Sequence, residues 1–148
     1  FWVFNNSWMI EHVLNPYTGV LASVTAALFR LFGSNAAAYG QMITVEGTSV
    51  TVATGCNGAE AFSLFCAAVL ALPTRFTRKL IGLGLGLVGI LIVNEIRIIG
   101  LVIVAVVRPD YLFEAHNYVG QTFVIVMGIA LWVYWAERYA TTSDTHAR

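Results

Sequence analysis

The chain has 148 residues, of which 58% are hydrophobic and 11% charged, and its mean hydropathy is +0.75. Soluble domains carry about 25% charged residues, so this composition excludes an ordinary soluble protein and indicates an integral membrane protein. Eight basic residues balance eight acidic ones, which is not the charge of a nucleic-acid-binding protein, so we expect no nucleic-acid partner.

The N-terminal third is mixed in polarity. The chain opens on Phe1 and "WVFNNSW", which reads as the end of an upstream apolar helix, so we expect the natural N-terminal segment to be missing. Residues 17–32 carry a stripe of apolar side chains with helical spacing, at Leu21, Val24, Leu28 and Leu31. This segment is short for a crossing, so it either lies on the outer surface as an amphipathic helix or crosses at a tilt.

Residues 41–54, "QMITVEGTSVTVAT", alternate apolar and polar side chains around Gly47. Alternation on both sides of a glycine-containing turn predicts a small β-hairpin. The hairpin leads directly to Cys56.

Three apolar runs follow, at about 57–72, 80–107 and 119–135, and each is predicted to cross the membrane. The loop "PTRFTRKL" between the first two carries Arg75, Arg78 and Lys79, so the positive-inside rule puts it in the cytoplasm. By parity the hairpin and residues 108–117 lie outside. The last run ends in aromatic residues that suit the membrane interface, Trp132, Tyr134, Trp135 and Tyr139.

The predicted fold class is therefore an all-α integral membrane protein. We expect one transmembrane domain over 1–148, a polytopic helix bundle with a small extracytoplasmic β-hairpin and an amphipathic helix.

Two cysteines differ in setting. Cys66 lies in the middle of an apolar run, where a cysteine is usually a small buried hydrophobe. Cys56 lies just before a helix N-terminus, on the same side as an arginine and a histidine, and this environment lowers a thiol pKa. Ten residues of helix rise about 15 Å, too far for a Cys56–Cys66 disulfide. We expect Cys56 to be a free, reactive thiol.

The segment "NEIR" places charge inside an apolar run. An arginine there is either a side chain reaching the headgroups or a functional residue, and ten apolar residues after Arg97 favour the second reading. Asn94 shares a helix face with Arg97, whereas Glu95 does not. Glu60 is the better partner for Arg97, either as a structural counter-ion or as a catalytic group.

His116 alone would be an ordinary loop histidine, as we take His12 and His146 to be. Its position on the same side as Cys56 makes it a candidate acid and base for a thiol. Glycines at 82, 86 and 89 form a small-residue stripe, most simply for close helix packing, with a substrate helix as the weaker reading.

The ordered segments "GCNGAEAF", "NEIRIIGL" and "HNYVGQTF" resemble the exosortase/archaeosortase family. That family combines an external Cys followed by Gly two residues on, an Asn-x-x-Arg segment, and a His at the head of the last helix. The resemblance covers about 40–135. Asn57 and Glu60 depart from the small hydroxyl and basic residues that many members have there, and they look closer to the short exosortase H branch.

The resemblance implies a catalytic domain with Cys56 as nucleophile, Arg97 stabilising the oxyanion and His116 as general acid and base. Asn94, Glu60 and Asn57 would support them. The implied partners are secreted proteins that end in a motif, a transmembrane helix and a basic tail, together with membrane lipids. Either water or an amine of a lipid or glycan would resolve the acyl-enzyme. The implied location is the cytoplasmic (inner) membrane, multi-pass, with the site facing outward.

The competing class is a non-enzymatic small transporter or assembly subunit that uses Glu60, Asn94, Glu95 and Arg97 as a polar network. Such a network has no need of a thiol. A metal site is a weaker third reading, because the Cys and His residues lack ligand spacing. We expect no cofactor and no metal.

Overall fold

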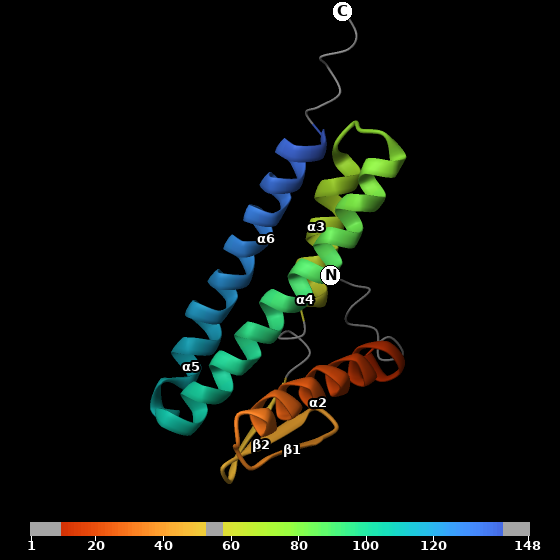
Figure 1. Ribbon diagram of the computed structural model, residues 1–148. Coiled ribbons are helices and arrows are strands. Elements are labelled where there is room, and N and C mark those ends of the chain that lie inside the picture. Colours follow the sequence, from red (N-terminus) through yellow and green to blue (C-terminus); the bar gives the residue numbers. More distant parts are fainter. Residues whose placement is uncertain (1–9, 53–57, 141–148) are drawn as a thin grey trace, which may run out of the picture. The chain divides into compact units, whose positions relative to one another are not determined.

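The structure is a computed structural model that describes residues 10–52 and 58–140 (Figure 1). The described residues are mostly helical, with one small sheet. The chain divides into two compact units, Phe1–Asn57 with Glu95–Gly120 and Gly58–Asn94 with Gln121–Arg148.

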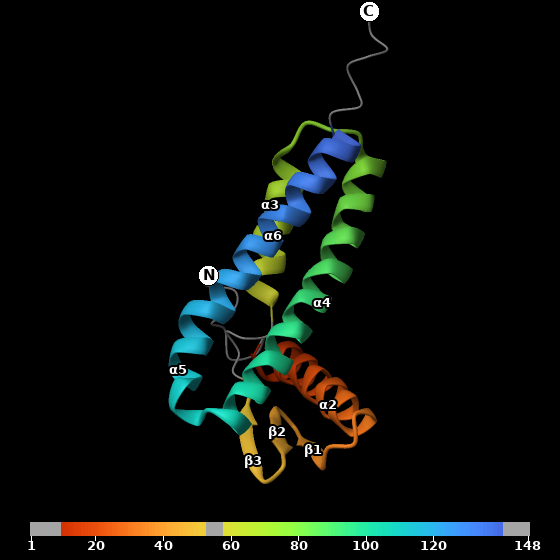
Figure 2. The same ribbon diagram turned by 60° about the vertical axis from the view of Figure 1, so that its left-hand side comes forward.

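The first unit contains the predicted hairpin and one strand more. Strands β1 (Ala36–Tyr39), β2 (Met42–Val45) and β3 (Thr48–Thr51) form an antiparallel sheet in the order β1-β2-β3 (Figure 2). The β2–β3 turn needs a left-handed backbone at Glu46 and Gly47, with φ of 49° and 83°. Two successive positive φ values are typical of the type I′ turn that suits a hairpin. The hairpin is confirmed, and its side of the membrane stays a prediction.

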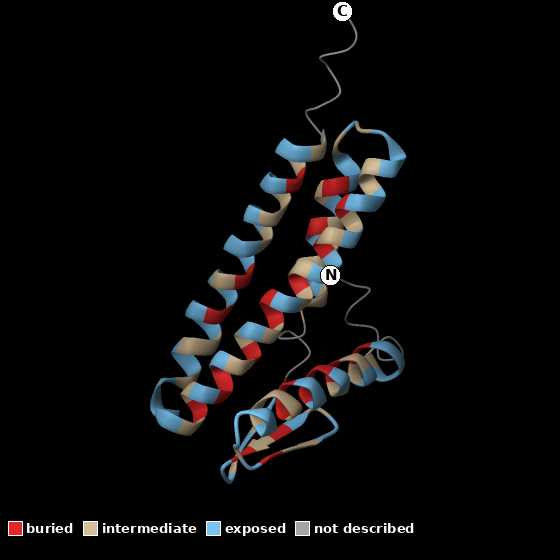
Figure 3. Cartoon of the chain, viewed as in Figure 1, coloured by how far each residue is buried: buried red, intermediate tan, exposed pale blue. Residues whose placement is uncertain are grey.

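Helix α2 (Asn15–Leu31) follows a π-helical turn, η2 (Ile10–Leu14), and packs on β1 and β2. Of the predicted apolar stripe, Leu21 is buried and Leu28 is half-buried, whereas Val24 and Leu31 are exposed. Apart from Leu21, the buried residues of α2 are small or polar, namely Thr18, Ala22, Thr25 and Ala26 (Figure 3). The reason is close approach to the sheet, since a Cβ on Gly19 would lie 3.5 Å from the carbonyl oxygen of Gly40.

Helix α4 (Phe76–Val107) is one continuous helix of 32 residues that runs through both units. It starts at Phe76 and not at the predicted residue 80, so Arg78 and Lys79 belong to the helix. After α4, the short turns η4 (Pro109–Tyr111), α5 (Leu112–Glu114) and η5 (Ala115–Gly120) complete the first unit.

The second unit packs α3 (Ala59–Ala71) and α6 (Gln121–Trp135), which continues into η6 (Ala136–Ala140), with the first part of α4. Its buried centre is formed by Phe65, Val69, Ile90 and Trp135. Trp135 is thus a core residue, fully buried, and not a member of the predicted aromatic belt, because its ring fills the space left by Gly82.

The glycine stripe packs against side chains of the same unit. Gly82 approaches Trp135, Gly86 approaches Phe65, and Gly89 approaches Leu131. The prediction of close helix packing is confirmed.

The basic residues at the start of α4 bind the ends of neighbouring helices. Lys79 Nζ donates to the carbonyl oxygen of Leu70 at 2.7 Å, and an Arg78 Nη donates to that of Tyr139 at 2.8 Å. Carbonyls at a helix C-terminus lack intrahelical donors and carry partial negative charge, so cations stabilise them.

Among the described residues, two helical stretches are long and apolar enough to cross a membrane, Phe76–Val107 and Pro109–Tyr139. They contain the predicted spans 80–107 and 119–135. The predicted span 57–72 corresponds to α3, whose 13 helical residues rise about 20 Å and so fall short of the roughly 30 Å core.

Candidate functional site

The predicted site residues lie on four segments of the chain. Arg97 is in α4 and His116 in η5, both in the first unit, whereas Glu60 in α3 and Asn94 in α4 belong to the second. Cys56 and Asn57 lie outside the described residues.

Arg97 lies against the turn that carries His116. A methyl group added at Gly120 would lie 2.8 Å from Arg97 Nε and 3.2 Å from the carbonyl oxygen of Ala115, so Arg97 fills the space that this glycine leaves. The charge of Arg97 also acts on the His116 imidazole. The two residues are 19 positions apart in sequence, and the fold brings them together.

The turn η5 is π-helical, as η2 and η6 are. Here the turn runs from Ala115 to Gly120 and holds both His116 and the glycine that accommodates Arg97. A guanidinium and an imidazole at one place offer a fixed cation beside a group that can take up and release a proton.

Asn94 is fully buried and packs against Gly58. A Cβ on Gly58 would lie 3.2 Å from Asn94 Cβ and Cγ, and Gly58 also has a left-handed φ of 76°. Both side-chain polar atoms of Asn94 lack a hydrogen-bond partner among the described residues. A buried amide without hydrogen-bond partners costs free energy, so Asn94 is kept as a candidate site residue.

The other predicted acid and the second cysteine lie on α3. Glu60 is in the first turn of the helix and is exposed. Cys66 is a half-buried free thiol in the same helix.

Glu95 has a role that the sequence analysis missed. Thr25 Oγ1 donates to Glu95 Oε1 at 2.5 Å, which joins α2 to α4 within the first unit. Tyr17 lies on α2, as Thr25 does. Burial raises the pKa of its hydroxyl, and the charge of Glu95 adds to this effect. Thr25 lies four residues after Leu21 and three before Leu28 of the predicted stripe, and this spacing was the available signal.

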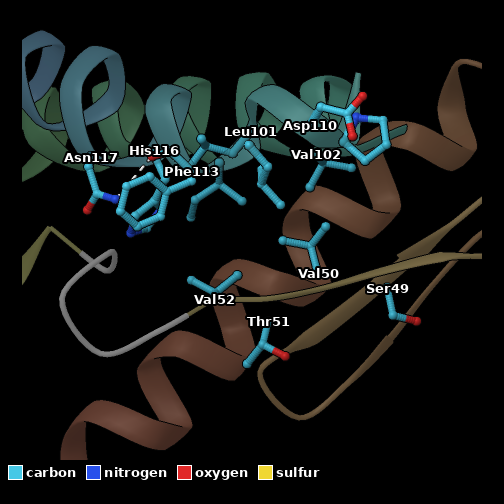
Figure 4. Close-up of a pocket in the computed structure, with 13 residues that line it drawn as sticks. Ser49, Val50, Thr51, Val52, Leu101, Val102, Asp110, Phe113, His116 and Asn117 are labelled. Atoms are coloured by element: carbon cyan, nitrogen blue, oxygen red, sulfur yellow. Dashed lines mark hydrogen bonds between the residues drawn. The ribbon is translucent and has the colours of Figure 1, made fainter. Parts of the chain in front are cut away.

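A cavity of about 480 Å³ opens beside His116 within the first unit (Figure 4). Strand β3 and the part of α4 around Leu101 form two of its walls, and the segment 109–117 forms the third. The ionisable residues that line it are Asp110 and His116. Asn117 Nδ2 donates to the carbonyl oxygen of Phe113 at 3.0 Å, which ties the third wall together. The volume of the cavity is in the usual range of ligand pockets, about 300–1,000 Å³.

Within the described part of the chain, no group of three or more His, Cys, Asp or Glu side chains could hold a metal ion.

Comparison with known proteins identifies the family. No match to the chain was found among curated proteins or among solved structures. The sequence model described as transmembrane exosortase, Exosortase_EpsH, matches residues 1–141. The match extends over nearly the whole sequence and agrees with the two long apolar helical stretches. The chain is a membrane protein and belongs to the transmembrane exosortase family.

Proposed function

We propose that this protein is a membrane-embedded cysteine transpeptidase or protease that cleaves the C-terminal sorting signal of secreted proteins. The reaction would take place at the outer face of the cytoplasmic (inner) membrane. Family membership supports the class of activity. The observation that carries the proposal is the packing of Arg97 beside the His116 turn, since acyl transfer needs a fixed cation and a proton carrier together.

Cys56 would be the nucleophile. Its thiolate attacks the carbonyl carbon of the scissile peptide bond, and the negative charge that develops on the carbonyl oxygen is stabilised by Arg97. The C–N bond then breaks, His116 gives a proton to the departing amine, and a thioester to Cys56 remains.

The second half of the reaction reverses the proton path. His116 takes a proton from the incoming nucleophile, which attacks the thioester and releases the Cys56 thiolate. With an amine of a lipid or glycan the protein is a transpeptidase, and with water it is a peptidase.

Asn94 is proposed to support the nucleophile. In the sequence only Asn57 separates Cys56 from Gly58, the glycine that contacts Asn94. The amide of Asn94, which has no hydrogen-bond partner among the described residues, would orient the substrate carbonyl or donate to the oxyanion. Glu60 and Asn57 are proposed as supporting residues. The exosortase H branch stays a prediction from Asn57 and Glu60.

The test is co-expression with a tagged secreted reporter. The reporter ends in a C-terminal signal from proteins of the same genome that finish in a motif, an apolar helix and a basic tail. We expect cleavage by the wild-type protein, none by Cys56→Ala, and normal cleavage by the matched control Cys66→Ala. Mass spectrometry of the new C-terminus distinguishes an added amine from hydrolysis. Equal damage from both cysteine variants would remove Cys56 as the nucleophile.

Alkylation distinguishes the non-enzymatic alternative. We expect Cys56 to react with an impermeant alkylating reagent at a pH well below ~8.5, which is the ordinary pKa of a cysteine thiol. A Cys56 that is inert, in a protein that cleaves none of the reporters, would favour a transporter or assembly subunit built on the polar residues of α4.

A further inference from the structure

Strand β3 is an open edge of the three-stranded sheet. The sheet order places β2 on one side of β3, and no other strand pairs with it in the described part of the chain. An edge strand exposes a row of backbone groups that can pair with another extended chain.

The register shows which backbone groups face outward. Val52 N donates to the carbonyl oxygen of Gln41 at 2.9 Å, and Val50 lies opposite Ile43 in the same register. Backbone direction alternates along an antiparallel strand, so Ser49 and Thr51 turn their N–H and C=O groups away from β2. Among the described residues these outward groups have no backbone partner outside the sheet.

This open edge borders the cavity beside His116. All residues of β3 from Ser49 onward line the cavity, and so does Val52. Figure 4 shows Val50 and Val52 on the side of the strand that faces Leu101 and Val102, whereas Ser49 and Thr51 carry their side chains on the other side. A chain that paired with β3 would therefore lie next to the imidazole.

We propose that the substrate binds as a fourth strand: its recognition segment pairs with the outer edge of β3, and its apolar side chains enter the cavity beside His116. This proposal rests on the proposed function. Alternating N–H and C=O groups on β3 match an extended peptide backbone, and a lipid chain offers no such groups. Asp110 in the cavity wall is unfavourable for an anionic lipid headgroup, so charge also favours a peptide.

Proline at an outward position tests the edge. Thr51→Pro removes the outward N–H and leaves the ladder to β2 intact, because proline is tolerated where the N–H points away from the partner strand. Losing a backbone hydrogen bond and leaving its partner unpaired should lower the rate of reporter cleavage about five- to thirtyfold. Thr51→Ala removes the side chain and keeps the N–H, so it should cleave faster than Thr51→Pro.

A second control uses the opposite edge of the sheet. In the register with β2, Ala38 on β1 also points its N–H outward, and it does not line the cavity. Ala38→Pro makes the same chemical change away from His116, so it should leave cleavage unchanged. Thermal unfolding in detergent checks that all three variants fold.

A second measurement does not depend on the rate. Reporters that carry a photoreactive residue at successive positions of the recognition segment should crosslink to the cavity wall at every second position, because side chains alternate along a strand. Cleavage by Thr51→Pro at the wild-type rate, or crosslinking without a period of two, would overturn the edge-strand proposal while the proposed function stood. Absence of Cys56-dependent cleavage in the wild-type protein would overturn both.

Discussion

Gly120 controls where Arg97 can lie. The Gly120→Ala change puts a methyl group 2.8 Å from Arg97 Nε, so the guanidinium must move. A displacement of about 1 Å at a reacting centre can lower a rate about 100-fold, and we expect a loss of that order in reporter cleavage.

The matched control is Gly100→Ala in α4, where an added Cβ meets nothing within 4 Å. It should cleave normally. If Gly120→Ala cleaved as well as Gly100→Ala, the position of Arg97 against the His116 turn would have no part in the reaction.

Gly58 combines a left-handed backbone with the contact to Asn94. Gly58→Ala should lower stability by about 1–2 kcal/mol for the backbone alone, and should also move Asn94. Gly33 has a similar φ of 85° and nothing within 4 Å of an added Cβ.

Gly33→Ala should therefore share the stability loss and keep activity, whereas Gly58→Ala should lose both. Thermal unfolding in detergent and reporter cleavage separate the two effects. Equal activity in these two variants would contradict a role for the Gly58–Asn94 contact.

Among the elements, the glycine positions of α4 make the packing of the second unit testable. Gly86 is in contact with the Phe65 ring, so Gly86→Ala overpacks the core and should cost about 1–3 kcal/mol in thermal unfolding. Gly84 is in the same helix with open space around it, so Gly84→Ala should leave stability unchanged or raise it. Phe65→Leu added to Gly86→Ala should recover part of the loss. A stable Gly86→Ala protein would mean that α3 packs elsewhere on α4.

The sequence predicted those elements whose own side chains determine them. Alternation around Gly47 predicted the hairpin, and apolar length predicted α4 and α6. Strand β1, "AAAY", was not predictable, because alanine has weak β propensity and the segment is a strand through its pairing with β2. The early start of α4 was missed because Arg78 and Lys79 read as loop residues, and their carbonyl partners come from other helices.

For the site, the order of motifs suggested Arg97 and His116, but only the fold shows that Gly120 makes room for the arginine. The spacing of residues along the sequence does not show that Gly120 and Arg97 are in contact. The link from Glu95 to Thr25 was missed because the pattern of apolar residues in 17–32 says nothing about which residue of another helix Thr25 contacts.

For the whole molecule, the length of α4 has a consequence at the membrane. Its 32 residues rise about 48 Å, whereas a helix tilted by about 40° needs only about 39 Å to cross a 30 Å core. We therefore expect part of α4 to extend beyond the hydrocarbon. We expect the extending part to be the Val107 end, because the basic residues at its other end favour the cytoplasmic interface.

Single cysteines placed at exposed positions test this in a background lacking Cys56 and Cys66. All four test positions have exposed side chains in the structure: Leu87 at 45%, Ile92 at 55%, Ile103 at 48% and Val107 at 66%. Differences in labelling between them therefore show which positions are covered by lipid. An impermeant maleimide added from outside should label positions 103 and 107 and spare 87 and 92. Protection at position 107 equal to that at position 87 would contradict the expected orientation.

The packing of Trp135 against Gly82 and of Leu131 against Gly89 bears on biosynthesis. Helices α3 and α4 leave the ribosome before α6 is made, so these small-residue gaps stay open until the last helix is synthesised. The indole N–H of Trp135 donates to the carbonyl oxygen of Arg78 at 3.1 Å, and this hydrogen bond also cannot form until α6 is made. A nascent chain that stops before Gln121 would lack α6 and would leave the space beside Gly82 and Gly89 unfilled. We expect membrane quality-control proteases to degrade such an incomplete helix bundle.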